Sequence, residues 1–380
     1  MHRGDVDERV SNQAGRADQG TGHRRTGAAD APERGSYPSH TPFEQPWWLE
    51  AVAPGRWGHV LVERGGEVVA RLPYVRKQKF GLTVLTQAPL TRFVGPWLRP
   101  SEGKYEKRLG VERELMGELI DRLPPHDVYR GNFAPAITNW LPFHWAGFDA
   151  TVRYTYRIDD LRDPDRLWAE LGGNVRSRVK RAAKGVEIRT DLESEAVLEE
   201  VLRINRRLFE RQGLGVSFGD DLARRLDAAC RARGAREVVT ATDSQGRLQA
   251  ALYLVRDATT TYLLYGGTDP EFRSTGVNSL VVWEAIRLAS QTSQHFDFLG
   301  SMIEPVERVN RSFGARQVPY FFVTRARPRA RAVFAARRGV RVARREVRRG
   351  AERLQRRLHG TQPPPADGAA KGGGAAKGSA

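Results

Sequence analysis

The stretch from Thr259 to Thr324 constrains the fold most, because strand-like and helix-like patterns alternate along it without a long gap. The run TTTYLLYGG has β-branched and aromatic residues close to alternation, which predicts a strand at Tyr262 to Tyr265, ended by Gly266-Gly267. SLVVWEAIRLASQT has a broad apolar face and predicts a helix that is buried on most sides. A strand in FDFLGS, a helix in EPVERVNRSFGA and a strand in VPYFFV complete the segment. This order favours a sheet with helices packed on its faces.

The same alternation extends upstream to Val186. Strand patterns occupy 186–190, 237–242 and 248–255, and helical patterns occupy 193–211 and 220–233. From Val186 to Thr324 the predicted order is therefore β-α-α-β-β-β-α-β-α-β. Cys230 lies on the apolar side of the second of these helices, so we expect a buried thiol and not a reactive one.

Several phrases of this region resemble a known family. TYLLYGGTDPEFR, WEAIRLA, FDFLGS, RSFGA and VPYF, with LWAELGGNVRSRVKRAAKGVEI upstream, are similar to the FemAB-like branch of the GNAT acyltransferase superfamily, also described as BioF2-like acetyltransferase domains. The resemblance covers residues 41 to 325. It implies an α/β (α+β) fold of tandem GNAT-like units, with a mixed central sheet flanked by helices and a better formed C-terminal unit.

The composition and the resemblance together divide the chain into five expected parts. These are a disordered leader (1–40), a degenerate N-terminal GNAT-like unit (41–158), a C-terminal GNAT acyltransferase unit (159–325), an Arg-rich amphipathic helix (326–359) and a flexible tail (360–380). The leader has almost no large apolar side chains, so folding it would not repay the lost chain entropy. We find no apolar signal region in it and no stretch of the ~20 apolar residues that a membrane span needs. These patterns predict a cytoplasmic protein.

A metal site is not expected. The single cysteine excludes an internal disulfide and a cysteine-based zinc cluster. The eight histidines show neither H-x-x-x-H nor H-E-x-x-H spacing. The sequence also lacks a G-x-S-x-G elbow and a Walker A loop, which argues against hydrolase and nucleotide-triphosphatase chemistry.

The positive charge of the chain is concentrated near its C-terminus. The formal net charge is +17, and residues 326–358 hold 13 Arg against Glu346 and Glu352, which gives 13 − 2 = +11. Val333, Ala336, Val340, Ala343, Val347, Ala351, Leu354 and Leu358 form a narrow apolar stripe at helical spacing. Such a helix suits an anionic surface, either phospholipid or RNA, with a solvated helix packed on the body as the structural alternative. A peripheral position on the inner face of a membrane follows from the lipid interpretation.

The loop Arg273-Ser274-Thr275-Gly276-Val277-Asn278 stands where the resemblance places the donor site. GNAT enzymes hold the pyrophosphate of acyl-CoA on backbone amides at a helix start, through a loop of the form R/Q-x-x-G-x-G/A. A helix N-terminus offers unpaired N–H groups and a positive dipole end to phosphate. Asn278 departs from the small residue of that pattern, and a plain turn with a helix cap is the structural alternative. The resemblance implies acyl-CoA (acetyl-CoA) or aminoacyl-tRNA as donor substrate, and no tightly bound cofactor.

Four residues near the FDFLGS strand are candidates for the chemistry. Acyl transfer to an amine needs a base for the ammonium proton and a hydrogen-bond donor for the oxyanion. Asp297 and Glu304 are the candidate bases, and Ser301 follows the strand end where the GNAT fold parts its middle strands. Tyr265 is the candidate donor to the oxyanion or to the leaving thiolate. The structural alternatives are a capping or ion-paired Asp297, a dipole-favoured Glu304 and a packed Tyr265.

Three further residues are candidates for substrate binding. Arg176 and Lys180 lie one helical turn apart and could grip one anionic group, such as a phosphate of the donor or of a lipid-linked acceptor. The structural alternative is a solvated helix face. Asp269 is a candidate contact that could equally be a turn residue.

Three functions remain open from the sequence. The first is a GNAT-superfamily N-acyltransferase that moves an acyl group from acyl-CoA to an amine of a cell-envelope, peptidoglycan or polysaccharide precursor. The second is a FemAB-type peptidyltransferase that uses aminoacyl-tRNA, with the Arg-rich segment holding RNA. The third is a catalytically silent, membrane-tethered scaffold in exopolysaccharide assembly, which a closed pocket beside Tyr265 and Asp297 would favour.

Overall fold

The computed structural model describes residues 37–190, 195–211, 215, 218–300 and 302–337. The described residues divide into two compact units, one that reaches Ala326 and one that starts at Arg327. In the second unit, residues 328–337 are helical. The remainder of the predicted 326–359 helix and the whole 360–380 tail lie outside the described residues, as does most of the predicted 1–40 leader. Residues 37–40 are described, and the His40 amide donates to the Glu44 carboxylate at 2.9 Å.

The first half of the larger unit combines strands with short helices. Its elements are η1 (Pro42–Glu44), α2 (Pro46–Val52), β1 (Trp57–Arg64), β2 (Glu67–Lys79), β3 (Leu82–Thr86), β4 (Trp97–Leu98), α3 (Tyr105–Asp121), β5 (Val128–Asn132), α4 (Leu141–Trp145) and β6 (Asp149–Ile158). Strands β1 and β2 form a hairpin, because they pair antiparallel across a turn in which Gly65 and Gly66 both have positive φ.

The second half follows the predicted order of strands and helices. Its elements are α5 (Pro164–Glu170), α6 (Gly173–Ala182), β7 (Val186–Arg189), α7 (Glu195–Arg211), α8 (Asp220–Arg231), β8 (Arg236–Asp243), β9 (Leu248–Arg256), β10 (Thr260–Thr268), η2 (Pro270–Phe272), α9 (Val277–Ala289), β11 (His295–Asp297), α10 (Glu304–Arg311) and β12 (Arg316–Ala326). From β7 to β12 this is the β-α-α-β-β-β-α-β-α-β order that the periodicity predicts. Cys230 is buried, as expected.

All strands of the described chain belong to one mixed sheet. Its order is β1-β2-β3-β5-β12-β6-β11-β10-β9-β8-β7, and β4 pairs with β2 beside this path. The last strand joins the two halves, because β12 pairs with β5 through Phe322–Ala326 and with β6 through Arg316–Thr324. The predicted mixed α/β fold with a helix-flanked sheet is confirmed.

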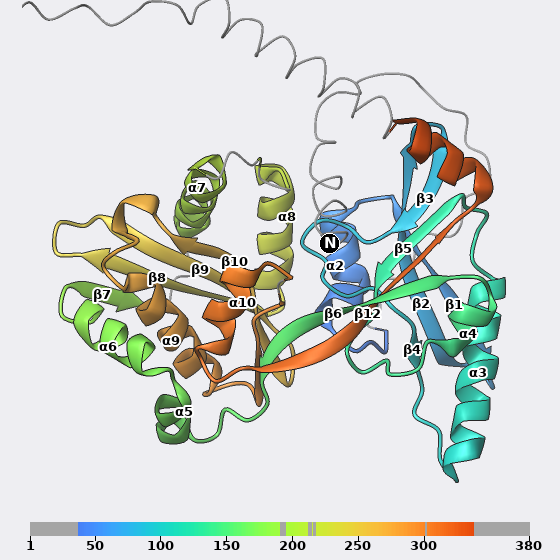
Figure 1. The fold of residues 1–380 in the computed structure, drawn as a ribbon, viewed down its shortest axis with the longest axis horizontal. Helices are drawn as coiled ribbons and strands as arrows, with labels where there is room; N and C mark the ends of the chain where they lie inside the picture. The colour runs from blue at the N-terminus through green and yellow to red at the C-terminus, as the bar shows by residue number, and fades with distance from the viewer. Residues whose placement is uncertain (1–36, 191–194, 212–214, 216–217, 301, 338–380) are drawn as a thin grey trace, which may run out of the picture. The chain divides into compact units, whose positions relative to one another are not determined.

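Helices cover both faces of the sheet in the second half. Helices α7 and α8 lie on one side of β8, β9 and β10, and α6 and α9 lie on the other (Figure 1). The α7/α8 side holds a core that also includes Phe43 and Trp48 from the start of the chain. The α9 side holds a second core around Trp283, and a third core lies between α3, α4 and the strands of the first half.

Strand β10 is longer than predicted. It runs through Gly266 and Gly267 to Thr268, so the prediction that the glycine pair ends the strand is wrong. A Cβ built on Gly266 would lie 2.3 Å from the backbone oxygen of Ala251 on β9. Glycine inside a strand here permits a close backbone approach and is no stop signal.

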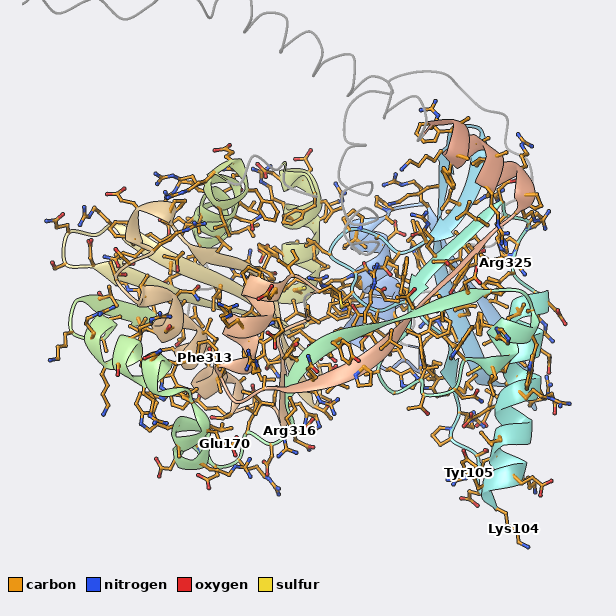
Figure 2. The ribbon with its side chains drawn as sticks, viewed as in Figure 1. Lys104, Tyr105, Glu170, Phe313, Arg316 and Arg325 are labelled. Carbon is orange, nitrogen blue, oxygen red and sulfur yellow. The ribbon has the colours of Figure 1, made fainter. Side chains whose placement is uncertain are left out.

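The turn after α10 packs against the end of α5. Gly314 follows α10 with φ 78°, the left-handed conformation that glycine commonly adopts after a helix end. A Cβ on Gly314 would lie 3.2 Å from the Glu170 Cβ at the end of α5. Glu170 and Phe313, the residue before Gly314, are labelled in Figure 2. In the described part of the chain no helix is long and apolar enough to span a membrane.

Candidate active site

Strands β10 and β11 part in the middle of the sheet. They pair parallel over three residues, from Thr260 opposite His295 to Tyr262 opposite Asp297. Strand β11 ends at Asp297, whereas β10 continues to Thr268. Beyond Tyr262, this edge of β10 is therefore left without β11 as a partner.

The chain after Asp297 turns away along β6. The Phe298 amide donates to the Tyr156 oxygen at 2.9 Å, and Leu299 and Gly300 both have positive φ. A Cβ on Gly300 would lie 2.2 Å from the Tyr154 oxygen, so only glycine fits against this strand. The turn at Leu299-Gly300, within FDFLGS, is the feature that separates the two strands.

A bulge in β10 lies beside the parted strands. Leu263 pairs with Leu254 and Tyr265 pairs with Tyr253, so Leu264 is an extra residue in the ladder. Bulges leave a backbone group unpaired and re-aim side chains, and they are frequent next to active sites. Periodicity alone does not predict this bulge, and its signal in the sequence is the departure of LLY from strict alternation.

Asp297 stands at the point where the strands part. Its side chain is 3% exposed, and its Oδ1 accepts hydrogen bonds from the Thr155 hydroxyl at 2.5 Å and from the Leu299 amide at 2.7 Å. Burial raises the pKa of this carboxyl to about 6, although both hydrogen bonds act in the opposite direction. A carboxyl with a pKa near neutrality can accept a proton at physiological pH.

Tyr265 is packed between aromatic rings. Its ring stacks on Tyr253 with centroids 4.8 Å apart and an interplanar angle of 6°, and Phe218 lies at 5.3 Å. The Tyr253 hydroxyl donates to Asp227 Oδ1 at 2.8 Å. Tyr265 is 8% exposed, and burial raises its phenol pKa well above the usual value. This environment matches the packing alternative and keeps the phenol protonated.

Glu304 is at the surface. It forms an ion pair with Arg308 at 2.9 Å, and the two side chains are 80% and 70% exposed. It also occupies the first turn of α10, where the helix dipole favours an acid. Asp297 is thus better placed than Glu304 as a base, and Ser301 lies outside the described residues.

The loop before α9 forms a helix start of the predicted kind. Gly276 is the N-cap with φ 89°, and its oxygen accepts from the Ser279 and Leu280 amides at 3.0 and 3.3 Å. The Val277 amide donates to Thr275 Oγ1 at 3.2 Å. Asn278, which departs from the family pattern, accepts a hydrogen bond from the Thr268 hydroxyl at 3.3 Å. Its side chain therefore ties the start of α9 to the end of β10.

Helix α6 packs directly on this loop. A Cβ on Gly276 would lie 3.1 Å from both the Cβ and the oxygen of Arg178. Arg181 Nη2 donates to the Ser274 oxygen at 3.4 Å. Arg273 itself is exposed. Cationic side chains from α6 thus lie beside the helix start, a pairing that periodicity does not reveal.

Asp269 connects the loop before α9 to helix α7 through ion pairs. Its carboxylate pairs with Arg207 and, at 3.6 Å, with Arg203. The same side chain accepts from the Glu271 amide at 3.1 Å and is buried. Arg211 Nη1 donates to the Pro270 oxygen at 3.2 Å. These contacts match the turn alternative for Asp269 and place further arginines around the loop.

Arg176 and Lys180 both face α5. Arg176 Nη1 donates to the Ala169 and Leu171 oxygens, each at 2.7 Å, which caps the C-terminal end of α5. Lys180 Nζ lies 5.9 Å from the centroid of the Trp168 ring. Arg176 hydrogen-bonds backbone oxygens, and Lys180 lies near the Trp168 ring. This geometry supports a structural role for the two side chains more than joint binding of one anionic group.

Comparison with known proteins agrees with this arrangement. Residues 172–305, which span α6, the loop before α9 and the parted strands, match the family described as acetyltransferase (GNAT) domain. This stretch is a GNAT-type acetyltransferase domain. The resemblance to the GNAT superfamily is thereby confirmed.

The solved structure of FemX shares this fold at low sequence identity. FemX aligns with a TM-score of 0.55 and 13% identity, over 75% of this chain and 93% of FemX. The C-terminal domain of a putative lysylphosphatidylglycerol synthetase from Agrobacterium fabrum gives a TM-score of 0.46, 11% identity and coverage of 74% and 87%. A tandem GNAT protein from the clavulanic acid biosynthesis pathway gives 0.46, 12% identity and coverage of 77% and 89%. The FemX likeness shows the fold alone, and no curated protein matches the sequence.

Proposed function

We propose that the GNAT domain transfers an acyl group from acyl-CoA to an amine of a cell-envelope or polysaccharide precursor. The observation that carries this proposal is the parting of β10 and β11 at Asp297, beside a helix start flanked by arginines. We place the thioester along the edge of β10 that lacks β11 as a partner, and a buried carboxylate stands where the two strands part. GNAT membership supports acyl transfer, and the donor and acceptor are our inference.

The loop before α9 is the proposed seat of the donor phosphates. The positive end of the helix dipole and the N–H groups of the first turn favour an anion. Arg273 on the loop, Arg178 and Arg181 on α6 and the arginines of α7 add positive charge around it. Asp269 neutralises part of this charge, so a net positive rim remains.

Asp297 is the proposed base. The amine nitrogen attacks the thioester carbon, the carbon–sulfur bond breaks, CoA leaves as the thiolate, and the ammonium proton passes to Asp297 directly or through water. Thr155 and the Leu299 amide fix the carboxylate in place. The raised pKa of Asp297 makes it a stronger base than an ordinary carboxylate.

Aminoacyl-tRNA is the alternative donor. The FemX-like fold and the +11 charge of residues 326–358 both support it. An RNA donor would draw on the same loop for its phosphates and on the Arg-rich segment for its backbone. A membrane role of that segment is the competing proposal, since cations next to an apolar stripe also suit an anionic lipid surface.

A scaffold without catalysis is the second function to test. The observation in its favour is the burial of Asp297 and Tyr265, which are 3% and 8% exposed. Neither side chain is openly accessible to a substrate at this exposure. A protein of this kind would bind neither donor.

Transfer assays separate the three functions. Purified full-length protein is incubated with radiolabelled acetyl-CoA and a panel of amino sugars, amino-acid amines and peptidoglycan precursors, and labelled product and free CoA thiol are both measured. The proposal predicts amine-dependent thiol release that Asp297→Asn abolishes. Transfer from aminoacyl-tRNA alone would select the second donor, and inertness toward both would select the scaffold.

A further inference from the structure

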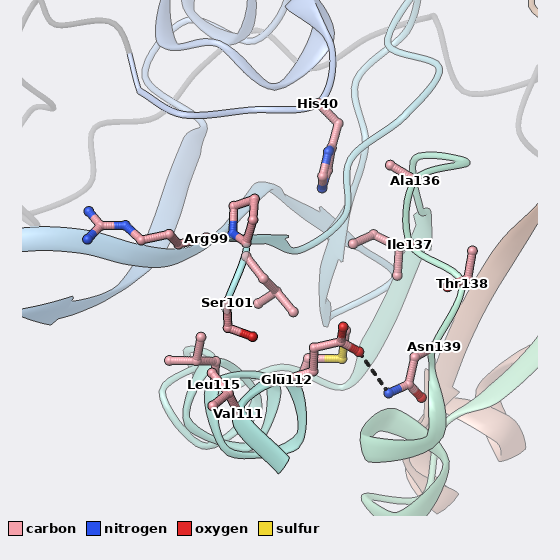
Figure 3. A pocket seen from close by; sticks show the side chains of 13 residues that line it. His40, Arg99, Ser101, Val111, Glu112, Leu115, Ala136, Ile137, Thr138 and Asn139 are labelled. Carbon is pink, nitrogen blue, oxygen red and sulfur yellow. Dashed lines mark hydrogen bonds between the residues drawn. The ribbon is translucent and has the colours of Figure 1, made fainter. Parts of the chain in front are cut away.

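A cavity in the first half of the larger unit is separate from the acyl-transfer centre. It has a volume of about 210 Å³ and lies between His40, the segment 98–101 after β4, the middle of α3 and the loop 136–139 (Figure 3). None of its lining residues belongs to the GNAT domain at 172–305. Ordinary ligand pockets span ≈ 300–1,000 Å³, so this cavity suits a small molecule.

His40 presents an unused ring nitrogen to this cavity. Figure 3 shows its imidazole directed from one side into the space above α3. Its Nε2 is buried and has no hydrogen-bond partner. The imidazole donates a hydrogen bond to the backbone carbonyl of Pro96. Burial lowers the pKa of His40 and so favours the neutral ring. A neutral imidazole that donates through one nitrogen has a lone pair on the other. The cavity therefore contains a hydrogen-bond acceptor without a donor from the protein.

Glu112 supplies the negative charge on the opposite side. Its Oε2 accepts from Asn139 Nδ2 at 3.2 Å, a neutral donor that leaves the carboxylate charge in place. Within the described ranges, no Lys or Arg lies within ion-pair distance of Glu112. The dashed line between Glu112 and Asn139 in Figure 3 marks this contact at the cavity wall.

The one cation in the lining is committed elsewhere. Arg99 pairs with Glu67 at 2.7 Å and donates to the Val68 oxygen at 3.2 Å. Its side chain extends away from the cavity in Figure 3. The charge that faces the cavity is therefore negative.

The remaining wall is apolar. Leu115, Met116 and Ile137 line it and are buried at 6%, 1% and 7% exposure. Apolar walls with a few convergent polar groups are the usual composition of a small-molecule site. We propose that this cavity binds a small protonated amine of monosaccharide size, with its ammonium group on Glu112 and a second donor on His40 Nε2. The inference does not rest on the proposed acyl transfer, because it uses none of that centre's residues.

Glucosamine is the probe, and glucose is its matched control because a hydroxyl replaces the ammonium group. Calorimetric titration of the full-length protein should show glucosamine binding at least ten times tighter than glucose. Glu112→Gln keeps the shape and the Asn139 hydrogen bond but removes the charge, and it should reduce glucosamine affinity at least tenfold. His40→Ala should also weaken glucosamine, whereas Glu106→Gln, an exposed acid on the same helix outside the cavity, should leave the affinity unchanged.

A methyl readout keeps the test independent of variant folding. The chain has three methionines, Met1, Met116 and Met302, and Met116 alone lines the cavity. With carbon-13 methyl-labelled methionine, glucosamine should shift the Met116 resonance and leave the other two in place. No binding, equal binding of glucose, parental affinity in Glu112→Gln, or a shift confined to Met302 would each overturn the proposal. Loss of acetyl transfer in Asp297→Asn with intact glucosamine binding would show that the two sites are separate.

Discussion

Gly276 and Arg178 are in backbone contact: a Cβ built on the glycine would lie 3.1 Å from the Arg178 oxygen and 3.1 Å from its Cβ. Helix α6 therefore packs against the N-terminal end of α9 at Gly276, which has no side chain. The resemblance to the GNAT loop pattern implies that this glycine permits the backbone to approach a phosphate. The structure adds a second reason, because φ 89° and the α6 contact each disfavour any other residue.

Gly276→Val should lower both stability and donor binding. The valine Cβ meets Arg178, and a β-branched residue is strained at positive φ, so α6 must shift and the loop with it. We expect a fall in Tm together with loss of CoA binding, measured by thermal unfolding and calorimetry on the same sample.

Arg273→Gln is the matched control for that experiment. Arg273 is exposed on the same loop, so its loss removes a cation without disturbing the packing of α6. A hydrogen bond to a charged group contributes roughly 1.5–3 kcal/mol, so CoA affinity should fall by about tenfold or more at unchanged Tm. Parental CoA affinity in Arg273→Gln would show that the phosphates lie elsewhere.

Asp297→Asn should cost roughly a hundredfold or more in turnover, the usual contribution of a general base. The parent should lose kcat/KM as pH falls through about 6, because protonation of the carboxyl removes the base. The variant should show no such dependence. Glu304→Gln, which breaks an exposed ion pair with Arg308, should keep near-parental turnover. If both variants kept parental turnover, neither carboxylate would carry the proton.

Glu44 should make stability depend on pH near neutrality. This carboxyl is 1% exposed, and burial raises its pKa from 4.5 to about 7, against hydrogen bonds from the backbone of Gly95, His40 and Thr41. Because the folded-state pKa is raised, protonated Glu44 contributes its full stabilisation below pH 4.5. This contribution to the free energy of unfolding falls as pH rises from 4.5 through 7, by about 3 kcal/mol in all. His59, with its pKa lowered to about 4, gives the opposite slope below pH 6.5.

Asp297, whose pKa is raised to about 6, gives a slope of the same sign that is largely complete by pH 6.5, so the comparison of parent with Glu44→Gln from pH 6.5 to 8 assigns the remaining slope to Glu44. Urea unfolding across this pH range should show falling stability in the parent and a flatter profile in Glu44→Gln. Identical slopes in the two proteins would mean that Glu44 is ionised in the folded state at neutral pH.

Truncation after Ala326 should leave the larger unit folded, because β12 ends there. The removed segment includes the +11 charge, and each cation near an anionic surface contributes on the order of 1 kcal/mol. Full-length protein should sediment with anionic vesicles and lose this attachment as salt shortens the Debye length below about 10 Å. Equal sedimentation of truncated protein would refute the membrane role, and retention of tRNA without vesicles would favour the RNA donor.

The sequence predicts the local elements of this fold well and their contacts poorly. Periodicity gives the order from β7 to β12 because each helix and strand carries its own apolar pattern. It misplaces the end of β10, since a glycine pair reads as a stop until the close approach of Ala251 is known. The pairing of β12 with β5 and β6 joins residues far apart in the chain, and no local pattern specifies it.

The candidate site divides in the same way. The FDFLGS break and the loop before α9 are visible in the sequence because glycine marks both. The partners that define their chemistry come from distant segments: Thr155 for Asp297, Arg178 for Gly276 and Arg207 for Asp269. Without its ion pair to Arg207, Asp269 could not be distinguished from a substrate-binding residue. The same holds for Arg176 without its hydrogen bonds to the end of α5.

Direct binding of the donor tests the central claim most sharply. Full-length protein, Arg273→Gln and Asp297→Asn are titrated calorimetrically with CoA, acetyl-CoA and aminoacyl-tRNA at one salt concentration. The account predicts saturable binding of CoA and acetyl-CoA by the parent and by Asp297→Asn, and binding weakened by about tenfold or more in Arg273→Gln. Binding of aminoacyl-tRNA without CoA, or of neither, would contradict the assignment of the loop before α9 as an acyl-CoA site.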